Sequence, residues 1–169
     1  APKKKKKKKK KKTKGATAGY NFQILSEREI ATCPKQGHIM YVGEEFFYMA
    51  DEVGQEIEVF RMADQELITT LPFNRSDYKT FEGDTIYVLA YPRSVFDPTK
   101  TVKTWKSMPT LEVYDPSTNS QTSYKFKLPK KIQQHNPLYN VDSISLLNET
   151  TLIVQRQNTG FIIDVYTLV

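Results

Sequence analysis

Apolar and polar residues alternate with a period of two along much of the chain from His38 onward, and turn-forming residues separate the alternating runs. The clearest case is the segment 111–129, LEVYDPSTNSQTSYKFKLP, where a short apolar run, a turn cluster and an alternating run follow one another. After the turn, Tyr124, Phe126 and Leu128 alternate with polar residues. Alternation on both sides of a turn-rich loop predicts a β-hairpin.

A valine followed by an aromatic residue recurs in this pattern and marks an internal repeat. The pairs are Val59-Phe60, Val113-Tyr114 and Val165-Tyr166, spaced 54 and 52 residues apart. The segment 57–73 follows the pattern of 111–129 in looser form, and the segment 162–168 repeats its first half. Sequence periods of this length are typical of proteins built from repeated units, such as the four-stranded blades of β-propellers.

The same alternation places individual strands within each repeat. In the first repeat we expect strands at 39–42, 46–50, 57–61 and 67–71. In the second repeat we expect them at 78–81, 86–90, 111–114 and 124–128. In the third repeat we expect them at 141–146, 151–154 and 161–166, with at best half of a fourth strand before Val169. Short strands joined by tight turns predict antiparallel sheets.

These units predict an all-β fold of antiparallel four-stranded repeat units, arranged as a partial β-propeller. The units span 38–75, 76–130 and 131–169, and the last one is incomplete. A segment from 20 to 37 leads into them, with a short strand and one helical turn. Because a propeller closes with about four or more blades, we expect the chain to be a fragment or to pair its open edge with something else.

Charge is distributed very unevenly along the chain. The tail 1–19 carries eleven lysines: Lys3, Lys4, Lys5, Lys6, Lys7, Lys8, Lys9, Lys10, Lys11, Lys12 and Lys14. Without these lysines, the remaining 14 basic residues stand against 19 acidic residues, so the rest of the chain is mildly acidic. The overall net charge of +6 therefore describes the tail and not the β-rich part of the chain.

A block of like charges repels itself, so the tail is expected to be disordered or extended. One interpretation is that these lysines bind a polyanion, which could be nucleic acid, anionic lipid or an acidic protein. The other interpretations are a solvated tail, an engineered addition, or a stretch of placeholder residues whose true identities are different. The sequence alone leaves these alternatives open.

Residues that usually carry catalysis or bind metals form no recognisable constellation. Cys33 is the only cysteine, and the two histidines, His38 and His135, lie 97 residues apart without metal-ligand spacing. Phosphate-binding glycine loops and nucleophile motifs are absent from the sequence. We therefore expect no catalytic residue, cofactor or metal in this chain. No apolar run approaches the length of a membrane span, so we also expect no transmembrane segment.

The longest connection within the β pattern runs from Tyr91 to Pro109, a length of 19 residues. Loops of this length within a compact domain are usually functional or disordered. Trp105, the single tryptophan, lies in this loop. It is a candidate anchor for a protein partner, and the alternative is that its ring folds back onto the edge of its own sheet.

The second repeat resembles the early blades of the methylamine dehydrogenase heavy subunit. The resemblance lies in DTIYVLAYPR at 84–93, in the basic loop that follows, and in the segment 111–129. The family shows an apolar strand that ends in an aromatic residue and an arginine, then a basic loop, a Glu-Val-aromatic-Asp-Pro turn and a closing Leu-Pro. The matching residues are Tyr91, Arg93, Glu112, Val113, Tyr114, Asp115, Pro116, Thr118, Leu128 and Pro129.

The resemblance implies a seven-bladed propeller that acts as the non-catalytic scaffold of a periplasmic quinoprotein amine dehydrogenase. In that family the quinone derived from tryptophan belongs to a separate light subunit, and the single tryptophan here is consistent with that. The resemblance places Tyr91 and Arg93 nearest to the partner subunit. This chain departs from the family in its two and a half repeats, its longer loop and its lysine tail.

Two functions therefore follow from the sequence. The first is a β-propeller segment that serves as scaffold or interaction surface for a partner subunit, or for the remaining blades. The second is a β-rich interaction module that its lysine tail tethers to nucleic acid or another polyanion.

Overall fold

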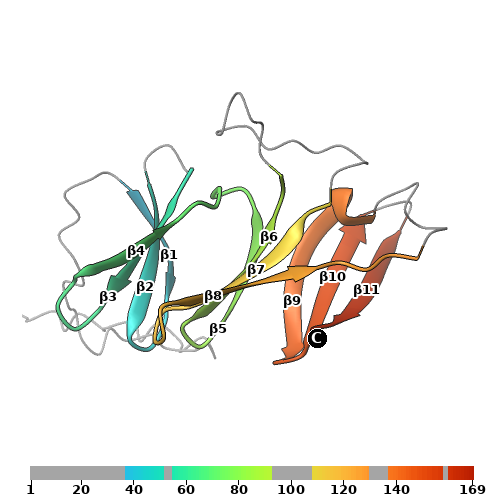
Figure 1. Cartoon of the computed structure of the whole chain (residues 1–169). Coiled ribbons are helices and arrows are strands. Elements are labelled where there is room, and N and C mark those ends of the chain that lie inside the picture. Colours follow the sequence, from blue (N-terminus) through green and yellow to red (C-terminus); the bar gives the residue numbers. More distant parts are fainter. Residues whose placement is uncertain (1–36, 52–54, 93–107, 130–136, 158–159) are drawn as a thin grey trace, which may run out of the picture.

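The computed structural model describes residues 37–51, 55–92, 108–129, 137–157 and 160–169. Within these ranges the protein is all-β, with eleven strands in three antiparallel sheets that lie one after another (Figure 1). The tail 1–19, most of the lead-in segment 20–37 and the helical turn expected there lie outside the described residues. The described sheets do not close into a propeller.

Each sheet is built from strands that are consecutive in the sequence. The first sheet holds β1 (Gly37–Val42), β2 (Phe46–Asp51), β3 (Ile57–Arg61) and β4 (Leu67–Leu71). The second sheet holds β5 (Tyr78–Glu82), β6 (Thr85–Ala90), β7 (Thr110–Asp115) and β8 (Ser120–Lys125). The third sheet holds β9 (Val141–Asn148), β10 (Thr151–Gln157) and β11 (Phe161–Thr167), preceded by the 3-10 turn η2 (Pro137–Tyr139).

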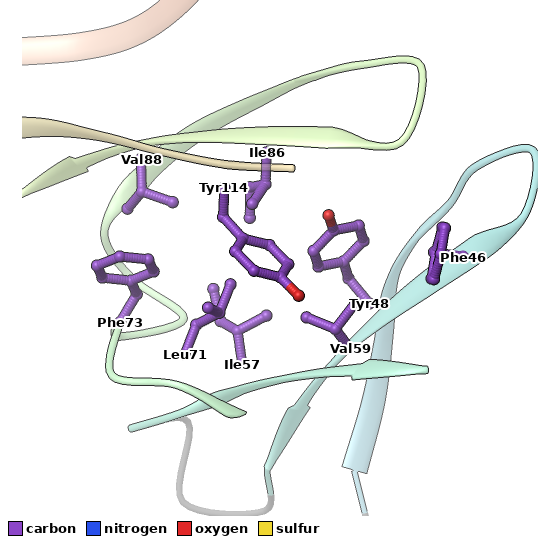
Figure 2. Close-up of a cluster of buried hydrophobic side chains, with 9 residues drawn as sticks. All are labelled: Phe46, Tyr48, Ile57, Val59, Leu71, Phe73, Ile86, Val88 and Tyr114. Carbon is purple, nitrogen blue, oxygen red and sulfur yellow. The ribbon is translucent and has the colours of Figure 1, made fainter. Parts of the chain in front are cut away.

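A hydrophobic core fills the space between the first and second sheets (Figure 2). Its buried members are Phe46, Tyr48, Ile57, Val59, Leu71, Phe73, Ile86, Val88 and Tyr114. Apart from Phe73, which follows β4, these residues come from strands with alternating or fully apolar sequences, so each sheet can bury one face against the next. At the side of this core, Tyr41 stacks on Phe81 with ring centroids 4.0 Å apart, which brings β1 and β5 together.

A second core fills the space between the second and third sheets. Its buried members are Tyr87, Leu89, Tyr91, Leu111, Val141, Ile144, Leu152 and Val154. The first strands of these two sheets, β5 and β9, also contact each other. Sheets that cannot bury both faces alone are thus stabilised by stacking, which is the way repeated units gain a continuous core.

The three valine–aromatic pairs occupy the third strand of each sheet and face the same way each time. Val59 packs into the first core, toward the second sheet, whereas Phe60 packs on the opposite face of its own sheet. Likewise Tyr114 faces the first sheet and Val113 packs against the second core. In each case the valine points toward the following sheet and the aromatic residue toward the preceding side, so the sequence repeat is also a structural repeat.

A carboxylate joins the turns at one end of the first two sheets. The side chain of Asp84 accepts hydrogen bonds from the backbone N–H groups of Glu44 at 2.7 Å, Glu45 at 3.1 Å and Phe46 at 3.4 Å. Gly43 lies so close that a Cβ atom there would be 1.9 Å from Asp84 Oδ1. The neighbouring Tyr48 hydroxyl donates to the carbonyl oxygen of Asp84 at 2.5 Å.

Most strand predictions are confirmed, and β3 and β4 have the predicted bounds. The strand expected at 124–128 was placed too late, because β8 begins at Ser120 directly after a four-residue turn and ends at Lys125. The hairpin itself is confirmed, with Asp115 opposite Ser120 and Thr110 opposite Lys125. The third unit contains three described strands.

Candidate interaction surface

The residues that the sequence singled out fall mostly outside the described part of the chain. Arg93, Trp105 and the lysines of the tail all lie in ranges that the structure does not describe. Tyr91 is described, and it is only 5% exposed. The structure thus brings none of these predicted residues together, and it gives a position for Tyr91 alone.

Tyr91 connects the second and third sheets. Its hydroxyl donates a hydrogen bond to the carbonyl oxygen of Leu138 in η2, and its ring lies 5.3 Å from the ring of Tyr139. Burial raises the pKa of the Tyr91 hydroxyl above its usual value, and the neighbouring Tyr78 and Tyr139 add to this effect. In this structure Tyr91 therefore contacts its own chain where the second and third sheets meet.

Three exposed apolar side chains lie on one face of β11. Phe161, Ile163 and Val165 alternate along this strand and are 77%, 63% and 62% exposed. Val165 lies opposite Ile153 of β10 in the register, so Ile153 shares this face. We refer to Ile153, Phe161, Ile163 and Val165 as the outer face of the third sheet. Single exposed apolar residues are ordinary, but a contiguous set is a candidate interaction surface.

The edge of β11 presents backbone groups that no other described strand pairs. The N–H of Leu168 donates to Thr150 at 2.8 Å, and the N–H of Gln157 donates to Asn140, away from β11, at 3.1 Å. Because hydrogen-bonded and non-hydrogen-bonded pairs alternate along an antiparallel ladder, these two bonds fix the direction of every group between them. The backbone groups of Phe161, Ile163, Val165 and Thr167 therefore point to the outer edge.

A cavity of about 490 Å³ lies beside this edge. Its walls come from the end of β8 with the residues that follow it, and from the end of β11. The lining residues are Leu111, Ser123, Tyr124, Lys125, Phe126, Lys127, Val165, Tyr166, Thr167, Leu168 and Val169. The rings of Phe126 and Tyr166 meet edge to face at 5.0 Å across it. Among the described lining residues, two are lysines and none is Asp or Glu.

An ion pair fixes the inner side of β11. Arg156 on β10 binds the carboxylate of Asp164 through Nε and through Nη2, the latter at 3.2 Å, and both side chains are mostly buried. Burial, and then the negative charge of Asp164, raise the pKa of Tyr166 to about 12, and Arg156 opposes this shift. Tyr166 therefore stays neutral at physiological pH and acts as an aromatic wall of the cavity.

An acidic residue precedes each valine–aromatic pair, namely Glu58, Glu112 and Asp164. Glu112 accepts hydrogen bonds from Thr110 at 2.7 Å, Gln121 at 2.9 Å and Ser123 at 2.8 Å. Burial pushes the pKa of Glu112 up, but these three hydrogen bonds outweigh it and hold the pKa below its usual value. The carboxylates of Glu112 and Asp164 thus form hydrogen bonds within or between neighbouring strands and stabilise the sheets.

Within the described ranges, no group of histidine, cysteine, aspartate or glutamate residues is arranged to hold a metal ion. His38 lies exposed on β1, while Cys33 and His135 lie outside those ranges. None of the described helices is long and apolar enough to cross a membrane. Comparisons with family models, with curated proteins and with solved structures found no match to this chain.

The outer face was missed in the sequence, although a signal for it was present. The sequence predicts a strand at 161–166, and the apolar residues Phe161, Ile163 and Val165 alternate along it. Sequence periodicity shows that one face is apolar, but it cannot show whether another sheet covers that face. The repeat itself held the missing information, because Val165 is the one member of its series that no described sheet covers.

Proposed function

We propose that this chain is a non-catalytic β-sheet scaffold, part of a β-propeller, which binds a further β-sheet on the outer face of its third sheet. The observation that carries the proposal is the phase of the repeat. Val59 is covered by the second sheet and Val113 packs toward the third, whereas Val165 is 62% exposed. The outer face therefore has the chemistry and orientation of a surface that is buried at the two earlier positions.

The repeat also specifies what the partner must present. Tyr114 extends from its third strand into the core beside Val59 (Figure 2), and Tyr166 extends in the same way toward the second sheet. In the repeat, the aromatic residue of each third strand packs toward the preceding sheet. The sheet that covers Val165 would therefore place an aromatic residue of its own third strand against Val165. The proposed partner is thus another antiparallel sheet of this repeat type, supplied by a partner subunit.

A narrower form of the proposal assigns the scaffold to a quinoprotein amine dehydrogenase. The support for it is the resemblance of 84–129 to the heavy subunit of methylamine dehydrogenase. In this form the quinone and the reacting groups belong to another subunit, and the chain contributes only surface.

The test compares variants of the outer face in the complex isolated from the cell that makes it. The doubly substituted chain, Phe161→Asp with Val165→Asp, places two charges where an apolar sheet should pack, and burying unpaired charge costs several kcal/mol. The control is Ser76→Asp, which adds a charge at an exposed turn of the second sheet. Native mass spectrometry should show a stoichiometric heteromer for the wild type and the control, and a free chain for the double variant.

Two results would contradict the proposal. The first is a wild-type chain that is monomeric in its native preparation, and the second is a heteromer that the double variant leaves intact. The amine dehydrogenase form has its own readout, which is dye reduction by a primary amine. This activity should be found only in the heteromer and should be lost with the partner, so turnover by the free chain would refute it.

A second function, attachment to a polyanion, is favoured by the eleven lysines of the tail. Each lysine that neutralises a phosphate releases a counterion, so binding should weaken steeply with salt. Deleting residues 1–14 should abolish binding to heparin and to single-stranded RNA while the β-sheets keep their stability. If the truncated chain binds these polyanions equally well, the tail is not the binding element.

A further inference from the structure

The third sheet has an empty strand position at the outer edge of β11, as judged from the described residues. In the first sheet β4 pairs with β3, and in the second sheet β8 pairs with β7. The internal repeat makes β11 the counterpart of β3 and β7. At that edge, however, no described strand pairs with β11.

The edge is suited to pairing in its backbone. The outward groups belong to Phe161, Ile163, Val165 and Thr167, so an incoming strand would meet four N–H and four C=O groups at regular spacing. Natural proteins usually protect such an edge with a proline, a bulge or inward-pointing charges. The β11 sequence, FIIDVYT, contains no proline, and its pairing with β10 has no register shift. Its one inward-pointing charge, Asp164, is neutralised by an ion pair with β10.

The cavity beside the edge is suited to side chains. Tyr124, Phe126 and Tyr166 supply aromatic surface, and Val165 and Thr167 of the edge itself complete the wall. In an added strand every second side chain would point toward this cavity, because side chains alternate between the two faces of a sheet. A volume of about 490 Å³ is large enough for several aliphatic side chains.

Charge indicates which sequences fit. Lys125 and Lys127 belong to the lining and are exposed, and no lining residue that the structure describes is Asp or Glu. An acidic residue next to the apolar side chains would therefore gain a favourable partner, whereas a basic residue would be repelled. Because these lysines are exposed, their contribution should be modest and should decrease with salt.

We propose that the edge of β11 binds an extended, acidic segment of a partner protein, which becomes the fourth strand of the third sheet and inserts alternate apolar side chains into the adjacent cavity. This is recognition by strand addition, in which main-chain hydrogen bonds provide affinity and pockets for alternate side chains provide specificity. The inference rests on the proposed scaffold function, and it adds the segment by which the partner is held.

The experiment uses the full chain and two fluorescent peptides of about eight residues. The first peptide has valines at alternate positions, threonines between them and one acidic residue at each end. The second has the same composition, but its valines are contiguous. Fluorescence anisotropy is recorded at moderate salt. Because both peptides carry the same charge, the lysine tail attracts them equally. A difference in their affinities therefore reports binding at the edge of β11 and its adjacent cavity.

The decisive variant is Ile163→Pro, with Ile163→Thr as its matched control. The N–H of Ile163 points outward, so proline there removes one donor from the free edge and obstructs an incoming strand, but leaves the ladder with β10 intact. The wild type and Ile163→Thr should prefer the alternating peptide, and Ile163→Pro should weaken its binding by about tenfold or more. Lys127→Glu should weaken it by a few-fold.

Hydrogen exchange gives an independent readout. In the free chain, the amides of Ile163 and Val165 should exchange fast while those of Ile162 and Tyr166 are protected by β10. The alternating peptide should slow the exchange of Ile163 and Val165. If both amides are already protected without peptide, another strand occupies the edge. Protection that rises with protein concentration would identify that strand as part of a second copy, and protection independent of concentration would identify it as part of the same chain. Either result overturns the proposal, as does equal affinity for the two peptides.

The outer-face variant separates this inference from the scaffold proposal. Phe161→Asp with Val165→Asp changes side chains on the face but keeps every outward N–H group. If the face variant disrupts the native heteromer while the wild-type chain fails to discriminate the peptides, the scaffold proposal stands and strand addition fails. If the peptides are discriminated but no heteromer exists, strand addition stands on its own and the scaffold proposal fails.

Discussion

Removing the carboxylate of Asp84 tests whether the first two sheets are held together at their turns as well as by their core. The Asp84→Ala variant deletes an acceptor for three backbone N–H groups, those of Glu44, Glu45 and Phe46, at 2.7, 3.1 and 3.4 Å. All three belong to the β1–β2 connection and the start of β2. Asp84 lies in the β5–β6 turn, so the substitution affects the contact between the two sheets.

The expected loss follows from the geometry. A hydrogen bond to a charged acceptor contributes about 1.5–3 kcal/mol where it is buried, but these donors lie near the surface and water can replace the lost acceptor. The closest parallel is a helix N-cap carboxylate, whose removal costs about 0.5–2 kcal/mol. We therefore expect Asp84→Ala to lower the free energy of unfolding by about 2 kcal/mol. For a chain of this size that corresponds to a fall in Tm of about 4–8 °C.

The assay is urea unfolding followed by circular dichroism, with Glu149→Ala as the control. Glu149 lies at an exposed turn of the third sheet, so its substitution removes the same charge without changing the contact between Asp84 and the β1–β2 connection. Asp84→Asn keeps one acceptor oxygen and should lose about half as much stability. Gly43→Ala should lose a comparable amount, because its Cβ would lie 1.9 Å from Asp84 Oδ1 and must displace the carboxylate.

The double variant Gly43→Ala with Asp84→Ala provides the refutation. If both substitutions act by removing the same carboxylate from its donors, their effects are coupled and the double variant costs little more than either single one. Additive losses would show that Gly43 acts independently of Asp84. A loss for Asp84→Ala that equals that of Glu149→Ala would show that the carboxylate does not join the sheets.

Two further predictions concern the second and third sheets. Leu152 is fully buried and faces the second sheet, whereas Ile153 lies on the outer face. Thermal unfolding should therefore show that Leu152→Ala lowers the free energy of unfolding by about 2–5 kcal/mol and that Ile153→Ala lowers it clearly less. Equal losses would mean that the two faces are wrongly assigned. The pKa of Glu112 is lower in the folded chain than in the unfolded one, so its carboxylate contributes stability that is fully present above the unfolded pKa and is lost as pH falls through the folded pKa. Wild type should therefore lose more stability than Glu112→Gln when pH is lowered from about 5 to 3, and parallel stability curves for the two proteins would contradict this.

The strands were predictable because their periodicity is local. Segments such as 57–61 and 86–90 are apolar enough to identify buried strands, and turn residues such as those at 116–119 mark the connections. The start of β8 was missed because its first residues, SQTS, are polar on both faces. An edge strand can be polar when the ladder with its neighbour supplies the hydrogen bonds, and that ladder with β7 is a tertiary feature.

The all-β class, the repeat and the position of its valine–aromatic pairs could be predicted, because they depend on the spacing of apolar residues along one strand. The burial of Tyr91 against η2, the contact of Asp84 with a second turn and the exposure of Val165 could not be predicted from that spacing. A side chain's own sequence neighbours set the face on which it lies, but residues far away in the chain determine whether anything packs against that face.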